Sequence, residues 1–89
     1  MREIETNDRP VAAPMSEAMI AALDAASRRW DRTVCSNRGT TWALFRRGFV
    51  EIHRGRGTDR HGRTTYGVIV DVKITDAGRV AVRAAMAAK

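Results

Sequence analysis

The chain has 89 residues, the size of one small domain, and its 16 Lys and Arg against 10 Asp and Glu give a net charge of +6. Fourteen of the basic residues are Arg, and this surplus favours a polyanionic partner, although an Arg- and Ala-rich composition can also reflect GC-rich coding. The single Cys35 excludes an internal disulfide, no apolar run reaches the ~20 residues that span a bilayer, and no secretory signal pattern is present, so we expect a cytoplasmic protein without membrane contact.

The first third of the chain predicts an arm followed by a helix. Residues 1–13 mix charged residues, Asn and Pro without periodicity, which predicts a flexible arm ahead of a single domain over residues 14–89. A helix is predicted over about 15–29, because Ser16 can cap it and apolar residues follow at helical spacing. The residues expected on its core stripe are Met15, Met19, Ala22, Leu23, Ala26 and Trp30.

A second helix is predicted over about 37–47. Ser36 or Asn37 can cap its N-terminus, and Gly48 tolerates the left-handed conformation in which helices often end. Helical spacing gives this helix a core face with Thr41, Leu44 and Phe45, and an outward face with Trp42 and Arg46. Only residues 31–35 separate the two helices, which leaves room for a turn or a short strand.

Two strands follow the second helix. A strand over 49–53 should pair as a hairpin with a second strand in which apolar and other residues alternate strictly. The alternating side chains expected to face the core are Tyr66, Val68, Val70, Val72 and Ile74. The connection over residues 54–63 contains three Gly and four Arg, is too long for a tight turn, and should project into solvent.

A last helix, capped by Thr75, is predicted over about 76–88. Its expected core face consists of Ala77, Val80, Ala81 and Ala84. A second apolar stripe on the opposite side consists of Val82, Ala85 and Met86. Because a small domain covers only one of these faces with its own core, the second stripe predicts a symmetric homodimer.

Two motifs at the ends of the expected hairpin carry a family resemblance. Thr41-x-x-Leu44-x-x-Arg47-Gly48-Phe49-Val50 is similar to T-x-x-L-x-x-R-G-L-V, and Ile74-Thr75-Asp76-Ala77-Gly78-Arg79 is similar to L-T-P-A-G-R. Both patterns are typical of small bacterial and phage proteins of the winged-helix (winged helix-turn-helix) family, which the order of elements over about 16–88 also resembles. The resemblance implies an α+β fold in which helices, a two-stranded β-hairpin wing and a C-terminal helix form one domain.

The same resemblance implies two sets of DNA-binding residues. Those that would face the major groove from the recognition helix are Asn37, Arg38, Thr40, Trp42 and Arg46, and those that would contact phosphates or the minor groove from the wing are Arg54, Arg56, Arg60 and Arg63. Asn37 and Arg38 are the expected base readers, because Asn pairs with adenine and Arg with guanine. Between residues 28 and 63, ten Arg accompany only three acidic residues, so the positive charge is concentrated there. An Arg- and Gly-rich loop can, however, also be a plain flexible connection.

We therefore expect a sequence-specific double-stranded DNA-binding protein, either a small transcriptional regulator or a phage repressor or excisionase-like factor, in a bacterial or phage-infected cell. The alternative is a winged-helix scaffold that binds and disables a host protein, which an outward Trp42 would favour. The His, Asp and Cys residues lack the paired spacing of a structural zinc site, and no catalytic set stands out. We accordingly expect no metal, no cofactor and no enzyme activity.

Overall fold

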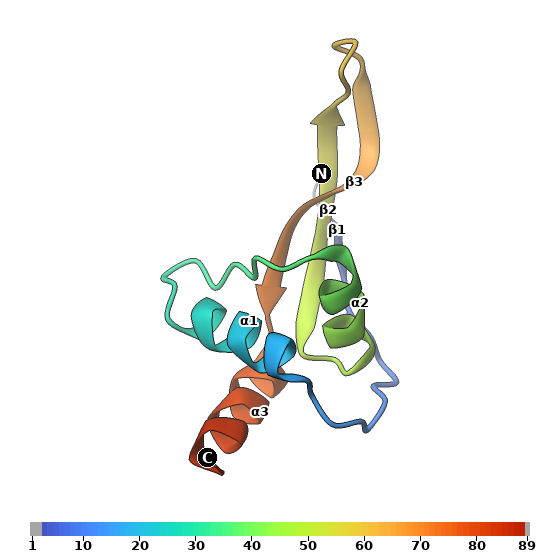
Figure 1. The fold of residues 1–89 in the computed structure, drawn as a ribbon. Coiled ribbons are helices and arrows are strands. Elements are labelled where there is room, and N and C mark those ends of the chain that lie inside the picture. Colours follow the sequence, from blue (N-terminus) through green and yellow to red (C-terminus); the bar gives the residue numbers. More distant parts are fainter. Residues whose placement is uncertain (1–2, 89) are drawn as a thin grey trace.

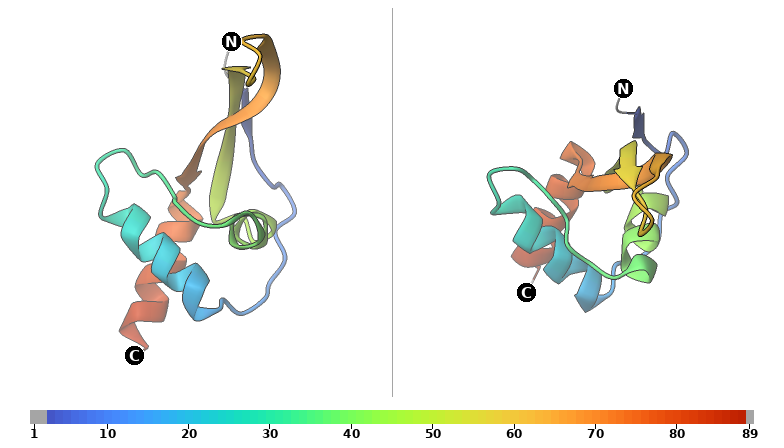
Figure 2. Two further views of the ribbon diagram at one scale, coloured as in Figure 1. Left: turned by 45° about the horizontal axis from the view of Figure 1, so that its top comes forward. Right: turned by 90° about the horizontal axis from the view of Figure 1, so that it is seen from above.

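The computed structural model describes residues 3–88 as a mixed α+β chain (Figure 1). The elements in chain order are β1 (Glu3–Glu5), α1 (Glu17–Ser27), α2 (Arg38–Arg46), β2 (Val50–Thr58), β3 (Thr64–Ile74) and α3 (Asp76–Ala87). The strands form one antiparallel sheet in the order β1-β2-β3. The three helices gather around the base of the β2–β3 hairpin, and the far end of the hairpin rises beyond them (Figures 1 and 2).

All three predicted helices are confirmed to within two residues at each end, because their caps form as expected. The side chains of Ser16, Asn37 and Thr75 each accept a hydrogen bond from the backbone N–H three residues later, at 3.3, 2.8 and 3.1 Å. Each cap satisfies one of the N–H groups that the first turn of a helix leaves without a helical partner. Local side-chain chemistry therefore accounts for where the helices begin.

The hydrophobic core joins α1, α2 and α3 to the base of the hairpin. Its buried members are Leu23, Ala26, Val34, Leu44, Val50, Ile74 and Val82. Leu23 and Leu44 are fully buried, as predicted for the core stripes of the first two helices. Half-buried side chains, including Met15, Met19 and Phe45, pack against this cluster.

The N-terminal segment differs from the predicted flexible arm, and it makes the sheet three-stranded rather than two-stranded. β1 pairs along β2, with Glu3 opposite Arg54 and Glu5 opposite Ile52. Further along, the Asn7 side chain donates to the carbonyl of Arg46 at 2.8 Å. A strand of three residues has too little periodicity to be recognised in the sequence, so its position depends on contacts with distant residues.

The hairpin is longer than predicted, and the alternation of β3 is interrupted. β2 has nine residues and β3 has eleven, and the two additional residues of β3 form β-bulges at two shifts in the pairing register. One bulge includes Gly67, whose φ of 72° suits a residue without a Cβ. Because the strands continue into the predicted basic loop, only residues 59–63 remain as a turn.

The predicted inward set of β3 is correct only at the base of the hairpin. Ile74 is buried and Val72 packs against the core, but Tyr66 is 79% exposed and Val70 is also exposed. Each bulge reverses which side chains face which side of the sheet. Beyond the helices, moreover, neither face of the hairpin is covered (Figure 1).

The core face of α3 is the reverse of the predicted one. Val82 is only 4% exposed, whereas Val80 is 65% exposed. The reason is Gly78, which is buried so close to the Phe49 carbonyl that a side chain would not fit. This contact turns the side of the helix with Gly78 and Val82 inward. The predicted dimer stripe of Val82, Ala85 and Met86 is therefore wrong in its first member, because Val82 belongs to the core of its own chain.

The two sequence motifs meet at the base of the hairpin. The Thr75 hydroxyl donates to the Gly48 carbonyl at 2.8 Å, and the Thr75 N–H donates to the Phe49 carbonyl at 3.0 Å. Val50 pairs with Ile74 in the same place. These residues therefore join the end of α2, both strands and the start of α3 at one point.

Candidate nucleic-acid interface

The candidate interface is the side of the helical body from which the hairpin rises. The N-terminal end of α2 and the connection between α1 and α2, residues 28–37, both lie on this side (Figures 1 and 2). The hairpin, the start of α2 and this connection thus surround one corner of the molecule. In the described chain, no helix is long and apolar enough to cross a membrane.

Three of the four predicted wing arginines are exposed, and the fourth has a structural role. Arg56, Arg60 and Arg63 lie in the outer part of the hairpin. Arg54 instead donates from Nε to Glu5 Oε2 at 2.8 Å and from Nη1 to the Gly67 carbonyl at 2.8 Å. It therefore connects β1 to the bulge in β3, and this leaves three arginines to contact a ligand.

The turn at the tip of the hairpin is held by Asp59. Its Oδ1 atom accepts hydrogen bonds from the N–H groups of His61 and Arg63, both at 2.9 Å. Its own N–H donates to the Arg63 carbonyl at 3.0 Å. The two arginines of this turn are thus presented by a closed, hydrogen-bonded turn rather than by a long loop.

The start of α2 contains the two predicted base readers, and of these two, Arg38 is exposed with no side-chain hydrogen bond to another described residue. Asn37 is exposed, but its Oδ1 atom accepts the N–H of Thr40 at 2.8 Å as the helix cap. A paired contact to adenine needs this oxygen as an acceptor for the adenine amino group. Asn37 is therefore occupied as a cap, and Arg38 is the better placed of the two to read a base.

The remaining α2 residues are less well placed for a groove contact. Trp42 is half-buried, and its ring meets that of Phe45 edge to face at 5.6 Å and 89°. It is therefore part of the packing rather than a free outward side chain. Thr40 is half-buried, and Arg46 is exposed at the other end of the helix, about 12 Å from Arg38 at a rise of about 1.5 Å per residue.

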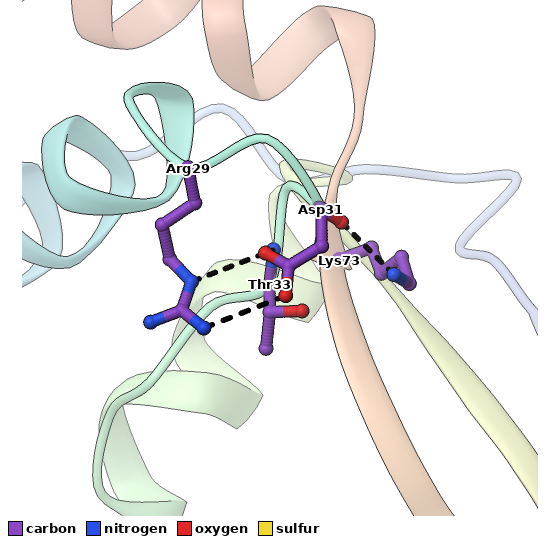
Figure 3. Close-up of polar contacts among 4 residues, drawn as sticks. All are labelled: Arg29, Asp31, Thr33 and Lys73. Carbon is purple, nitrogen blue, oxygen red and sulfur yellow. Dashed lines mark hydrogen bonds and ion pairs between the residues drawn. The ribbon is translucent and has the colours of Figure 1, made fainter.

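A polar cluster holds the connection between α1 and α2 against the sheet (Figure 3). Asp31 Oδ1 accepts from Arg29 Nε at 3.1 Å and from the Thr33 N–H at 3.1 Å, while Oδ2 accepts from Arg29 Nη2 at 3.4 Å. Lys73 Nζ donates to the Asp31 carbonyl at 2.9 Å. The hydrogen bonds from Arg29 and Thr33 hold the pKa of the Asp31 carboxyl well below its usual range.

The backbone of this connection also pairs with β3, which agrees with the turn or short strand predicted over residues 31–35. Thr33 forms an isolated bridge with Lys73, and the Val34 N–H donates to the Val72 carbonyl at 2.7 Å. The Ile74 N–H donates to the Arg32 carbonyl at 3.0 Å. The connection is therefore fixed to the outer edge of β3 at the base of the hairpin.

Trp30 and Arg32 in this connection were not among the predicted site residues. Trp30 is 95% exposed, although helical spacing predicts it on the core stripe of α1. The helix ends at Ser27, so Trp30 no longer follows the helical period. Arg32 is exposed and has a φ of 59°, which is uncommon outside Gly. The sequence feature that could have indicated this is the group of Arg residues around Trp30 and Asp31, because it interrupts the apolar stripe before Trp30.

The other polar groups do not form a second site of recognisable chemistry. His53 is buried on β2, and its Nε2 atom lies 3.0 Å from Glu51 Oε1, so it is part of the sheet rather than a ligand site. Within residues 3–88, no three His, Cys, Asp or Glu side chains gather as a metal ion would require.

No family model, curated protein or solved structure matches this chain.

Proposed function

We propose that this chain is a winged-helix protein that binds double-stranded DNA, with the β2–β3 hairpin as the wing and the start of α2 as the base-reading element. The observation that carries the proposal is the group of three exposed arginines, Arg56, Arg60 and Arg63, in the outer part of a projecting hairpin. The start of α2, which contains the exposed Arg38, lies on the side of the body from which the hairpin rises (Figure 1). Exposed guanidinium groups without a described carboxylate partner are suited to phosphate contacts.

The winged-helix part of the proposal is supported by the joint between the two motifs. In it, α2 leads directly into β2, and β3 leads directly into α3 through the hydrogen bonds of Thr75 to Gly48 and Phe49. The hairpin is therefore fixed to the C-terminal end of α2, the helix whose N-terminal end would read bases. A wing and a recognition helix must keep such a constant relation if both are to contact one duplex.

In this mechanism the wing supplies affinity and Arg38 supplies sequence preference. Phosphate contacts position a protein on the duplex and carry no sequence information, whereas a paired Arg contact selects guanine. Asn37 contributes by starting α2 in the right place. A protein of this kind would act as a small transcriptional regulator, or as a repressor or excisionase-like factor, in the cytoplasm of a bacterial or phage-infected cell.

The first test replaces Arg56, Arg60 and Arg63 together with Ala. If each arginine neutralises about one phosphate, the slope of log K against log salt should fall by about 2 to 3 units. A control variant replaces Arg9, Arg79 and Arg83, which lowers the net charge equally but changes residues outside the hairpin. Equal changes of slope in both variants, or no duplex affinity of the wild type at low salt, would contradict the proposal.

The second test distinguishes a residue that reads a base from one that caps the helix at the start of α2. Arg38→Ala should lower affinity for a preferred site by about 5- to 150-fold, the equivalent of about 1 to 3 kcal/mol, with little effect on non-specific affinity. Asn37→Ser keeps a capping oxygen and removes the amide, so it should change neither affinity by more than about twofold. A large loss of sequence preference in Asn37→Ser would instead identify Asn37 as a base reader.

The alternative function, capture of a host protein, depended on an outward Trp42. Because Trp42 is half-buried against Phe45, we do not propose that function from this residue.

A further inference from the structure

Trp30 has the most exposed large apolar side chain of those described, at 95%. It belongs to the connection between α1 and α2, and this connection runs along the side of the body from which the hairpin rises (Figure 1). Single exposed apolar residues are common on protein surfaces, and they are usually aliphatic or only partly exposed. An indole that is exposed over nearly its whole surface has both of its faces available to a partner.

The turn that carries Trp30 is held in place on both sides of the residue. Before it, the Arg29 N–H donates to the Ala26 carbonyl at 3.1 Å and its guanidinium binds Asp31. After it, the Arg32 N–H donates to the Arg29 carbonyl at 3.3 Å, and the Arg32 carbonyl accepts from the Ile74 N–H at 3.0 Å. The backbone is therefore already ordered, and a partner that binds the indole does not have to order it.

The charge around Trp30 favours an anionic partner. Arg32 is exposed and has no carboxylate partner among the described residues, whereas Arg28 Nε pairs with Asp24 Oδ1 at 3.3 Å. The carboxylate of Asp31, which follows Trp30 in the chain, is engaged by Arg29 (Figure 3). Arg32, two positions after the indole, is thus a cationic group that can contact a phosphate next to a base.

We propose that Trp30 stacks on an unpaired base of the bound DNA, while Arg32 contacts a phosphate next to that base. This inference rests on the proposed DNA binding by the wing. In an intact duplex the base faces already stack on one another within rigid base pairs, so a flat indole finds a base that is free to stack only at an unpaired nucleotide. The preferred ligand is therefore a duplex that continues into a single-stranded segment.

The experiment compares a blunt mixed-sequence duplex with the same duplex carrying a short single-stranded extension. The protein is used in a Trp42→Phe background, so that Trp30 is the sole tryptophan and reports its own contact through fluorescence. Stacking on one base should make the extended duplex bind about 5- to 150-fold more tightly than the blunt one, with quenching of Trp30 emission only by the extended duplex.

Two variants at Trp30 define the contact. Trp30→Ala should remove the preference for the extended duplex and leave affinity for the blunt duplex unchanged, because the side chain is exposed and its loss leaves no cavity. Trp30→Phe keeps an aromatic face and should retain part of the preference. Val80→Ala, at an exposed position of α3, is the matched control and should change neither affinity.

The outcomes separate this inference from the function on which it depends. If the wild type binds both duplexes equally, or if Trp30→Ala weakens both by the same factor, the stacking contact is refuted while DNA binding stands. A protein partner for Trp30 is then the remaining reading. If no DNA binds at low salt, the proposed function itself fails, and the stacking contact fails with it.

Discussion

Replacing Gly78 with Ala should destabilise the protein, although Ala is the better helix former. A Cβ at this position would lie far closer to the Phe49 carbonyl oxygen than van der Waals contact allows, 2.9 Å from Ile74 Cγ1 and 3.1 Å from the Phe49 carbonyl carbon. The carbonyl cannot move away without weakening its 3.0 Å hydrogen bond from the Thr75 N–H. The obstacle is thus mainly backbone, which adapts less easily than a side chain.

The expected magnitude follows from two opposing contributions. Overpacking of a well-ordered core costs about 1 to 3 kcal/mol, and a clash with backbone belongs at the upper end of that range. The change from Gly to Ala in a helix stabilises the folded state by about 1 kcal/mol. The net loss in the free energy of unfolding is therefore about 2 kcal/mol, which lowers Tm by roughly 8 to 16 °C in a domain of this size.

The assay is thermal and urea unfolding followed by circular dichroism, with Gly39→Ala as the matched control. Gly39 also lies in a helix, but a Cβ there would have only Asn37 Oδ1 nearby, at 3.5 Å. The control should therefore stabilise the protein by up to about 1 kcal/mol. If Gly78→Ala stabilises the protein as Gly39→Ala does, then α3 is not seated against Phe49 as described.

Three further predictions concern the α1–α2 connection and the core. Asp31→Asn should lower Tm near neutral pH, because the Asp31 carboxylate stabilises the folded state. The folded state depresses the pKa of Asp31, so this stabilisation is complete above the ordinary pKa of about 4 and is lost on acidification. The difference in Tm between the variant and the wild type should therefore shrink below about pH 4, and a difference that stays constant with pH would contradict this. Arg32→Gly should stabilise the protein by about 0.5 to 1 kcal/mol in urea unfolding, because Gly adopts the φ of 59° without strain; destabilisation would show that the Arg32 side chain has a structural role. Leu44→Ala should cost about 2 to 5 kcal/mol in the same assay, because Leu44 is fully buried, and a loss below about 1 kcal/mol would mean that the site is poorly packed.

The helices could be predicted because their determinants are local. A cap such as Asn37 acts on an N–H three residues away, and the fully buried Leu23 and Leu44 lie on stripes that recur at helical spacing. The rotation of α3 could not be predicted in the same way, because both of its faces are apolar. Gly78 decides between them through a contact with Phe49, which lies 29 positions earlier in the chain.

In the strands and the candidate interface, too, local patterns were predictable and contacts between distant residues were not. The alternation of β3 predicts a strand, but the two bulges that change its facing arise from its pairing with β2. The arginines of the hairpin are visible in the sequence, whereas the engagement of Arg54 depends on Glu5, which the unexpected strand β1 brings beside it. Trp30 was assigned to the core because its spacing fits a helix that in fact ends at Ser27.

The two bulges in β3 also bear on how copies of this chain avoid one another. β3 is an edge strand of the sheet, and its outer half contains exposed Tyr66, Ile69 and Val70. A regular, apolar edge strand of this kind is a template on which an identical strand can add, and repeated addition leads to aggregates. Bulges interrupt the even spacing of N–H and C=O groups and increase the local twist, so a second strand cannot pair along the whole edge. The irregularity that breaks the alternation of β3 therefore also protects the exposed apolar part of the hairpin from intermolecular sheet formation.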